Sequence, residues 1–212
     1  TALDEFSNPR KAGIIAVDLD EGDFLIGAAL TDGQHDVMLF SDGGKAVRFD
    51  ENDVRPMGRN ARGVRGMMLE EGQSVIAMLV AGDEQQSVLT ATENGFGKRT
   101  SITEYTRHGR GTKGMIAIQQ SERNGKVVAA TLVHADDEIM LITDKGVLVR
   151  TRVAEIRELG RATQGVTLIG LDEGSRLSGL QRIVENDANA TDTEAPADEP
   201  TDGTHGGDST TE

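Results

Sequence analysis

A glycine-rich stretch near the middle of the chain, GRNARGVRG at residues 58–66, carries three arginines and no acid. Guanidinium groups bind phosphate oxygens through paired hydrogen bonds. Glycines beside them let backbone N–H groups approach an anion closely. The stretch therefore predicts a contact site for phosphate groups, built from Arg59, Arg62 and Arg65. Such a site is unexpected in a chain whose formal net charge is -14.

Two further connections have a similar composition. Residues 105–121 hold Arg107, Arg110 and Lys113 without an acid, and GRATQGV further along the chain supplies Arg161. An ordinary solvated surface would explain one such segment. Recurrence of the pattern indicates a repeated function instead.

The recurrence has a fixed period of 51 residues. It relates SDGGKAVRF (41–49), TENGFGKRT (92–100) and TDKGVLVRT (143–151). Four sets of residues keep this spacing: Gly44, Gly95 and Gly146; Arg48, Arg99 and Arg150; Arg59, Arg110 and Arg161; Gly63, Gly114 and Gly165. Lys98 and Arg152 lie close to members of the second set. Two motifs, the turn motif of 41–49 and the glycine-rich motif of 58–66, thus keep one period. This indicates an array of structural repeats.

Each full repeat contains four strand-like runs. In the first repeat they span 36–40, 45–49, 63–69 and 74–80, and the SDGG turn joins the first two as a hairpin. A period near 50 with four strands per unit is typical of a propeller blade. We therefore predict an all-β, propeller-like array with a partial blade at 1–33 and blades at 34–82, 83–135 and 136–184.

The chain begins inside a repeat. PRKAGII (9–15) resembles the glycine-rich motif of 58–66, and no copy of the turn motif of 41–49 precedes it. We expect a fragment of a longer protein. Because each repeat needs a neighbour to cover its faces, three full repeats and a remnant predict an open crescent.

Residues 185–212 contain nine acids, no Lys or Arg and few apolar side chains. This composition predicts a disordered acidic tail. Without it the chain holds 27 acids and 22 bases, a net charge of -5. The chain also has no Cys, and no apolar run is long enough to cross a bilayer. These features predict a cytoplasmic protein.

Other motifs have simpler explanations. GRGTKG (109–114) matches the dinucleotide-binding G-x-G-x-x-G pattern, but a strand follows it instead of a helix. Tyr105 aligns with Val54 and Ile156 by the period, so we predict an apolar packing position and no catalytic tyrosine. The four histidines show no metal-ligand spacing, and DLDEGD (18–23) departs from the calcium-loop pattern. We predict no catalytic and no metal-binding residue.

The basic positions have one natural partner. Blades arranged around an axis place their basic residues at regular intervals, and duplex DNA offers a regular array of phosphates. Few aromatic residues accompany the charges, which disfavours binding of single strands. No segment resembles a recognition helix, so we expect contacts to the backbone with little sequence preference. The predicted contact residues are Arg48, Arg59, Arg62, Arg65, Lys98, Arg99, Arg107, Arg110, Lys113, Arg150, Arg152 and Arg161.

The strings HDVMLFSDGGKAVRF, TENGFGKRTSITEY and IMLITDKGVLVRTRVAEI resemble the C-terminal domain of DNA gyrase A, over residues 1 to about 185. The resemblance implies a β-pinwheel that wraps duplex DNA and supports ATP-dependent negative supercoiling. It also implies an A2B2 complex with the rest of gyrase A and with gyrase B, located at the bacterial nucleoid. ATP and Mg2+ would serve the complete enzyme, a type IIA topoisomerase, and no cofactor is expected in this fragment.

The match has gaps and alternatives. The family's Q-R-R-G-G-K-G box is absent, and HGRGTKG (108–114) shares only four of its seven letters. The catalytic tyrosine domain and the ATPase are absent as well. One alternative is the corresponding domain of topoisomerase IV, and the other is a protein-binding propeller. The second lacks the Trp-Asp and Gly-Gly-aromatic signatures of WD and kelch repeats.

Overall fold

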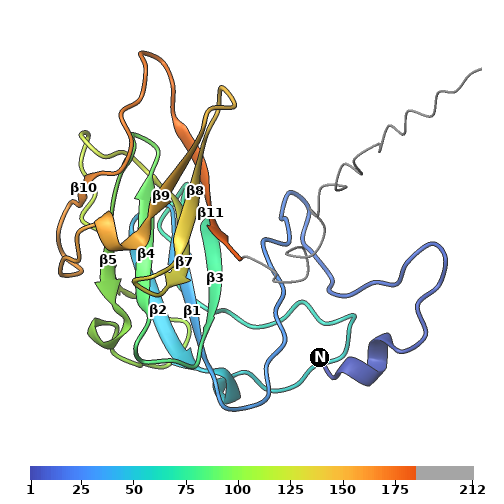
Figure 1. Cartoon of the computed structure of the whole chain (residues 1–212). Helices are drawn as coiled ribbons and strands as arrows, with labels where there is room; N and C mark the ends of the chain where they lie inside the picture. The colour runs from blue at the N-terminus through green and yellow to red at the C-terminus, as the bar shows by residue number, and fades with distance from the viewer. Residues whose placement is uncertain (185–212) are drawn as a thin grey trace, which may run out of the picture.

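The computed structural model describes residues 1–184, and the predicted acidic tail lies outside them. Figure 1 shows strands stacked as successive sheets, with the N-terminal residues to one side. The first repeat forms β1 (Asp36–Ser41), β2 (Lys45–Asp50), the 3-10 turn η2 (Glu51–Asp53) and β3 (Val75–Ala81). The second forms β4 (Ser87–Thr92), β5 (Phe96–Ser101), η3 (Ile102–Glu104), β6 (Met115–Ile116) and β7 (Val127–Val133). The third forms β8 (Glu138–Thr143), β9 (Leu148–Arg152), η4 (Val153–Glu155), β10 (Val166–Thr167) and β11 (Leu177–Ile183).

Every repeat begins with the predicted hairpin. β1 pairs antiparallel with β2, β4 with β5 and β8 with β9. The tight turns need a residue with positive φ, and Gly44 and Gly95 supply it at 75° and 80°. The antiparallel, all-β fold predicted from the sequence is confirmed, and no closed barrel forms among residues 1–184.

The third strand of a repeat does not stay in the sheet of its own repeat. β6 of the second repeat pairs with β2 of the first, with Ala46 opposite Met115. β10 of the third repeat pairs with β5 of the second in the same way. The sheet orders are therefore β3-β1-β2-β6, β10-β5-β4-β7 and β11-β8-β9. Each sheet is joined to the next by an exchanged strand, which the sequence pattern alone did not predict.

One predicted strand is absent from the described chain. Residues 63–69 contain only a bridge at Met67, which pairs with Thr112. The equivalent residues of the later repeats pair with Lys45–Ala46 and Phe96–Gly97. One period earlier, the corresponding partner would fall before Thr1. The run keeps its strand-like composition, but it has no edge to pair with among residues 1–184.

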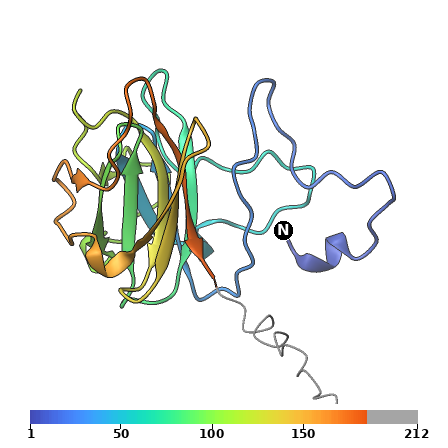
Figure 2. The same cartoon turned by 45° about the horizontal axis from the view of Figure 1, so that its top comes forward.

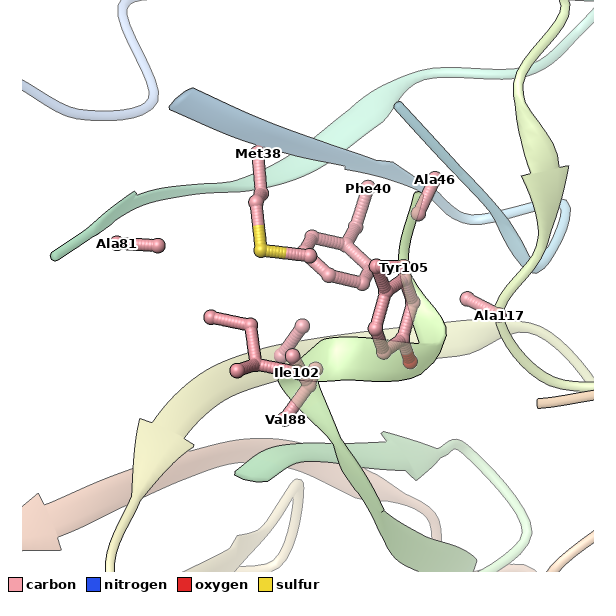
Figure 3. Packing of buried hydrophobic residues seen from close by; sticks show 9 residues of the cluster. Met38, Phe40, Ala46, Ala81, Val88, Ile102, Tyr105 and Ala117 are labelled. Carbon is pink, nitrogen blue, oxygen red and sulfur yellow. The ribbon is translucent and has the colours of Figure 1, made fainter. Parts of the chain in front are cut away.

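Apolar side chains from successive repeats make the core. Met38, Phe40 and Tyr105 meet between the first two sheets (Figure 3), and the rings of Phe40 and Tyr105 lie edge to face at 6.0 Å. Burial raises the pKa of the Tyr105 hydroxyl. A second cluster around Leu89, Ile139 and Ile156 joins the second and third sheets. The packing role predicted for Tyr105 is confirmed, because its side chain is buried.

Residues 1–33 form only the short 3-10 turn η1 (Leu3–Phe6) and contain no strand. In Figures 1 and 2 they extend away from the sheets, beside the long connection between β2 and β3. Asp18 N donates to Ala61 O at 3.2 Å and anchors the segment to that connection. Within residues 1–184, no helix has the length and apolar character needed to span a membrane.

Candidate nucleic-acid interface

The glycine-rich connections of the first two repeats lie side by side. Gly111 N donates to Gly66 O at 2.5 Å, and Met68 N donates to Thr112 O at 2.8 Å. Glycine at position 66 also lets the first connection pack closely on β1, since a Cβ at Gly66 would stand 2.3 Å from Leu39 Cδ1. Basic residues from two successive repeats thereby share one surface.

Six basic residues of these connections are exposed, including Arg55 and Arg110. We call the other four the loop cations: Arg62, Arg65, Arg107 and Lys113. Within residues 1–184 the side chains of Arg65 and Lys113 make no ion pair. Lys113 lines a cavity of about 380 Å³ together with His108, Gly109 and Thr112. Arg65 and Lys113 can therefore bind a phosphate without first breaking an ion pair, and the flanking glycines leave room for it to approach.

The other two loop cations are paired with acids. The Arg62 side chain is 68% exposed and contacts Asp18 at 3.0 Å and Asp20 at 2.7 Å, which raises its pKa. Arg107 contacts Asp36 at 2.7 Å and Asp50 at 3.3 Å. Exposed ion pairs of this kind contribute roughly 0–1 kcal/mol. A phosphate can replace the partners of Arg62 at little cost, whereas Arg107 is also held by the buried carboxylate of Asp36.

Arg59, Arg110 and Arg161 are equivalent by the period, and all three bind main-chain carbonyls. Arg110 Nη1 donates to Arg65 O at 3.2 Å, and Arg161 Nη1 donates to Ile116 O at 2.7 Å. Arg59 Nη1 donates to Ile15 O at 2.6 Å. Each guanidinium thus fastens its connection to the crossing segment of the preceding repeat. These residues position the basic loops. Arg59 and Arg161 are half-buried, whereas Arg110 is exposed.

Arg48 needs a correction, because its side chain is only 8% exposed. Its guanidinium binds Asp36 at 2.7 Å and donates to the carbonyls of Ile102 and Tyr105. Arg99 in the next repeat donates to Ile156 O at 2.8 Å, the carbonyl equivalent to that of Tyr105. Arg48 and Arg99, predicted at the DNA-facing surface of strand two, instead join consecutive repeats. We exclude Arg48 from the candidate interface and regard Arg99 as mainly structural.

Lys98 also lies in the interior, with 0% of its surface exposed. Its ammonium donates to Gly160 O at 2.6 Å and to Arg161 O at 2.7 Å. Burial lowers the pKa of Lys98 to about 8. We exclude Lys98 as well, because its charge is directed at the third repeat and away from solvent.

Arg150 and Arg152 stand on β9, at the end of the array, and both face Glu138. Arg150 Nε donates to Glu138 Oε2 at 2.7 Å, and Arg152 Nε lies 3.8 Å from Glu138 Oε1. Their side chains are more than half exposed. They belong to the third sheet and not to the paired connections, and they form a secondary part of the interface.

Sequence reasoning missed Arg157, which is exposed and makes no ion pair within the described chain. It lies in the string EIRELG, where two neighbouring acids hide the basic character of the third connection. Its main-chain carbonyl accepts a hydrogen bond from Arg99 N at 3.3 Å, which fixes its place beside β5. The signal that could have revealed it is its position in the repeat.

Asp32, His35 and Glu51 form a cluster whose ligand-type atoms all lie within 4.8 Å of one another. His35 N donates to Glu51 at 2.7 Å, and the imidazole of His35 contacts Asp32 at 2.8 Å. The hydrogen bond from His35 N ties the loop before β1 to η2. Because the Asp32 carboxylate is largely exposed, the geometry is that of a surface turn, and we assign no metal to it.

The family model of the DNA gyrase C-terminal domain, described as a β-propeller, matches residues 1–32, 35–81, 86–134 and 137–183. The DNA gyrase A protein of Pseudomonas aeruginosa is 56% identical over 185 residues, which cover 87% of this chain and 20% of that protein. The Escherichia coli protein is 52% identical over the same length, with 21% of it covered. The chain thus spans about a fifth of the length of these curated relatives.

Two solved structures are also similar. A DNA gyrase A C-terminal domain superposes with a TM-score of 0.75 at 30% identity, over 82% of this chain and 59% of that one. The C-terminal domain of DNA topoisomerase IV gives a TM-score of 0.81 at 25% identity, over 85% and 57%. The four matched segments and the identity above 50% confirm the resemblance found in the repeats: the chain belongs to the DNA gyrase C-terminal domain family.

Proposed function

We propose that this chain binds duplex DNA through the loop cations and bends it along successive repeats, as the DNA-wrapping domain of a gyrase A protein. The observation that carries the proposal is the pairing of two glycine-rich connections, which sets Arg65 and Lys113 on one exposed surface. Arginine, lysine and nearby backbone N–H groups suit phosphate oxygens. The family assignment supplies the partner to which these phosphates belong.

The wrapping part of the proposal rests on the repeated geometry. Exchange of β6 and β10 holds each sheet in a fixed relation to its neighbour. A cation at one connection is then followed by another at a regular interval. Duplex DNA that touches several connections must follow their curve, at an elastic cost of a few kcal/mol. Phosphate contacts without base contacts can offset that cost, so binding should tolerate many sequences.

In the complete enzyme the domain would act with the rest of gyrase A and with gyrase B in an A2B2 complex. The proposed role is to deliver a wrapped DNA segment for ATP-dependent negative supercoiling. ATP and Mg2+ would be bound by other parts of that enzyme. The proposal implies a location at the nucleoid of a bacterial cytoplasm.

The topoisomerase IV domain is the second candidate, favoured by its TM-score of 0.81. Identity favours gyrase, since a curated gyrase A relative is 56% identical, while the solved structures differ less, at 30% for gyrase A and 25% for topoisomerase IV. The two candidate functions differ in how strongly DNA is wrapped.

Wrapping is tested by ligating a nicked plasmid in the presence of increasing amounts of the chain. Constrained writhe should appear as a shift in linking number of one sign after the protein is removed. The Arg65→Gln/Lys113→Gln variant should give a smaller shift at the same concentration. An unchanged topoisomer distribution at saturating protein would contradict wrapping, even if binding is retained.

A further inference from the structure

The third connection, residues 156–171, is built like the second. Gln119 N donates to Thr163 O at 2.9 Å and joins the second connection to the third. The equivalent bond between the first two connections runs from Met68 N to Thr112 O at 2.8 Å. The 51-residue period relates both partners of these two bonds. The backbone therefore sets the third connection beside the second in the way that it sets the second beside the first.

The charges on the three connections differ. The first (54–69) and the second (105–120) each carry three exposed cations and no acid. The third carries one exposed cation, Arg157, and the exposed acid Glu158. By the period, none of the loop cations has a basic counterpart in the third connection, where the equivalent residues are Glu158, Gln164 and Thr167. The series of exposed cations that is regular over the first two connections is therefore broken at the third.

The acid in the third connection has a structural role. In the first repeat the arginine of strand two, Arg48, pairs with Asp36 of its own sheet at 2.7 Å. The second repeat has Ser87 in place of that aspartate, and Arg99 instead lies 3.8 Å from Glu158. The acid that faces the strand-two arginine thus comes from the connection and not from the sheet. As a result, a carboxylate stands at a position where the second connection carries a loop cation.

Gln164 stands at the one loop-cation position that is basic in both earlier connections, as Arg62 and Lys113. It is exposed, and its Oε1 accepts a hydrogen bond from Ser121 Oγ at 3.3 Å. Its main-chain carbonyl accepts another from Asn124 Nδ2 at 3.1 Å. Gln164 therefore holds the third connection to the second repeat but offers no charge to a phosphate.

The two cations of β9 do not fill this gap. Arg150 Nε donates to Glu138 at 2.7 Å, and Arg152 Nε lies 3.8 Å from the same carboxylate. Both stand on a strand of the third sheet and outside the third connection. Their charge is partly offset by the acid that they share.

We propose that duplex DNA held by the first two connections leaves the surface of the array before the third, and that residue 164 sets this limit. The inference rests on the proposed function and adds to it the point along these repeats at which the duplex departs. A duplex stays bent only where phosphate contacts offset its elastic energy. A connection with a single exposed cation beside an acid does not supply those contacts. Arg157 is consequently left outside the DNA contact, although it is as exposed a cation as Lys113.

Two variants that remove the same charge distinguish the second connection from the third. Lys113→Gln should weaken binding of a labelled duplex that spans the array, and it should reduce the slope of log K against log salt by about 0.9. Arg157→Gln should leave the affinity and the slope unchanged. Equal losses in the two variants would show that the third connection contacts DNA and would overturn the inference. No loss in either variant would refute the loop cations as the DNA contact, and the inference with them.

The opposite change tests residue 164. Gln164→Lys should strengthen duplex binding and steepen the salt slope by about 0.9, because it adds a phosphate contact where the duplex otherwise departs. It should also enlarge the shift in linking number in the plasmid ligation experiment. Gln164→Ala removes the contact with Ser121 without adding charge and should bind DNA like the parent chain.

The matched control for the added charge is Gln181→Lys, at an exposed position of β11 outside the connections. It should leave the salt slope and the shift in linking number unchanged. Identical salt slopes for Gln164→Lys and Gln181→Lys would overturn the role given to residue 164. The same holds if Gln164→Ala strengthens binding as much as Gln164→Lys.

Discussion

The cations of the repeats serve two purposes in this molecule. Arg48 and Lys98 are buried and bind carboxylates or carbonyls of neighbouring elements, while Arg65 and Lys113 are exposed. The sequence analysis placed buried and exposed cations together in one set of predicted contact residues, because the repeat period and the residue type do not indicate burial. Side chains that stand on a strand between two packed sheets are held inside. Those on glycine-rich connections remain at the surface.

The exposed pair carries a direct prediction. Arg65→Gln/Lys113→Gln should weaken duplex binding and reduce the slope of log K against log salt by about two, since each cation contributes near 0.9 per phosphate. The melting temperature should stay nearly unchanged. The control Lys145→Gln/Arg176→Gln removes the same charge from the third repeat, outside the loop cations. Equal losses of affinity in the two variants would refute the assignment of the interface.

Arg48 should behave as a structural residue. Arg48→Gln removes a buried ion pair to Asp36 and two hydrogen bonds to carbonyls, so the free energy of unfolding should fall by about 3 kcal/mol. Its repeat equivalent Arg150 is half exposed and pairs with Glu138, and Arg150→Gln should cost less than about 1 kcal/mol. Urea titration of both variants measures the difference. A larger loss for Arg150→Gln would contradict the structural role given to Arg48.

Lys98 predicts a dependence of stability on pH. Burial lowers its folded-state pKa to about 8, below the ordinary value of 10.5. Between these two values the unfolded chain binds more protons than the folded chain, so the free energy of unfolding rises as the pH increases. The gain should amount to about 1–3 kcal/mol across this pH window. This gain should be absent from the Lys98→Met variant. If its free energy of unfolding depends on pH in the same way as that of the parent chain, Lys98 is not responsible for the gain.

At the scale of the elements, strand exchange is the feature that sequence reasoning did not reach. The hairpins were predictable because SDGG, TENG and TDKG turns separate alternating apolar runs. The sequences of the short strands at 115–116 and 166–167 do not indicate which sheet each strand joins. Their partner is decided by tertiary packing against β2 and β5. For the same reason residues 63–69, which have the composition of a strand, form none.

Gly97 lies where β5 packs tightly against both β4 and the exchanged segment that contains β10. A Cβ there would lie 2.2 Å from Thr90 O and 2.5 Å from Leu168 Cδ1, next to β10. Gly97→Ala should therefore destabilise the fold by roughly 1–3 kcal/mol through overpacking. Gly179→Ala on β11 is the control, since its Cβ would meet nothing within 4 Å. Comparable unfolding midpoints for the two variants would contradict the close packing of β5 against β4 and the exchanged segment.

At the scale of the whole molecule, an acidic chain presents a local basic surface. The net charge of -14 includes nine acids in residues 185–212, beyond the described part of the chain. The remaining excess of acids is small, and several of them, including Asp36 and Glu138, are paired with arginines inside the array. Long-range attraction to DNA is consequently weak. Binding must depend on short-range contacts between phosphates and the loop cations.

Duplex affinity as a function of salt tests this account most directly. Fluorescence anisotropy of a labelled linear duplex of mixed sequence, titrated with the 212-residue chain at several salt concentrations, gives log K against log salt. Neutralisation of roughly 5–8 phosphates predicts a slope of about -4 to -7, with similar affinity for unrelated sequences. A slope near zero, or a strong preference for one short sequence, would contradict binding to the DNA backbone.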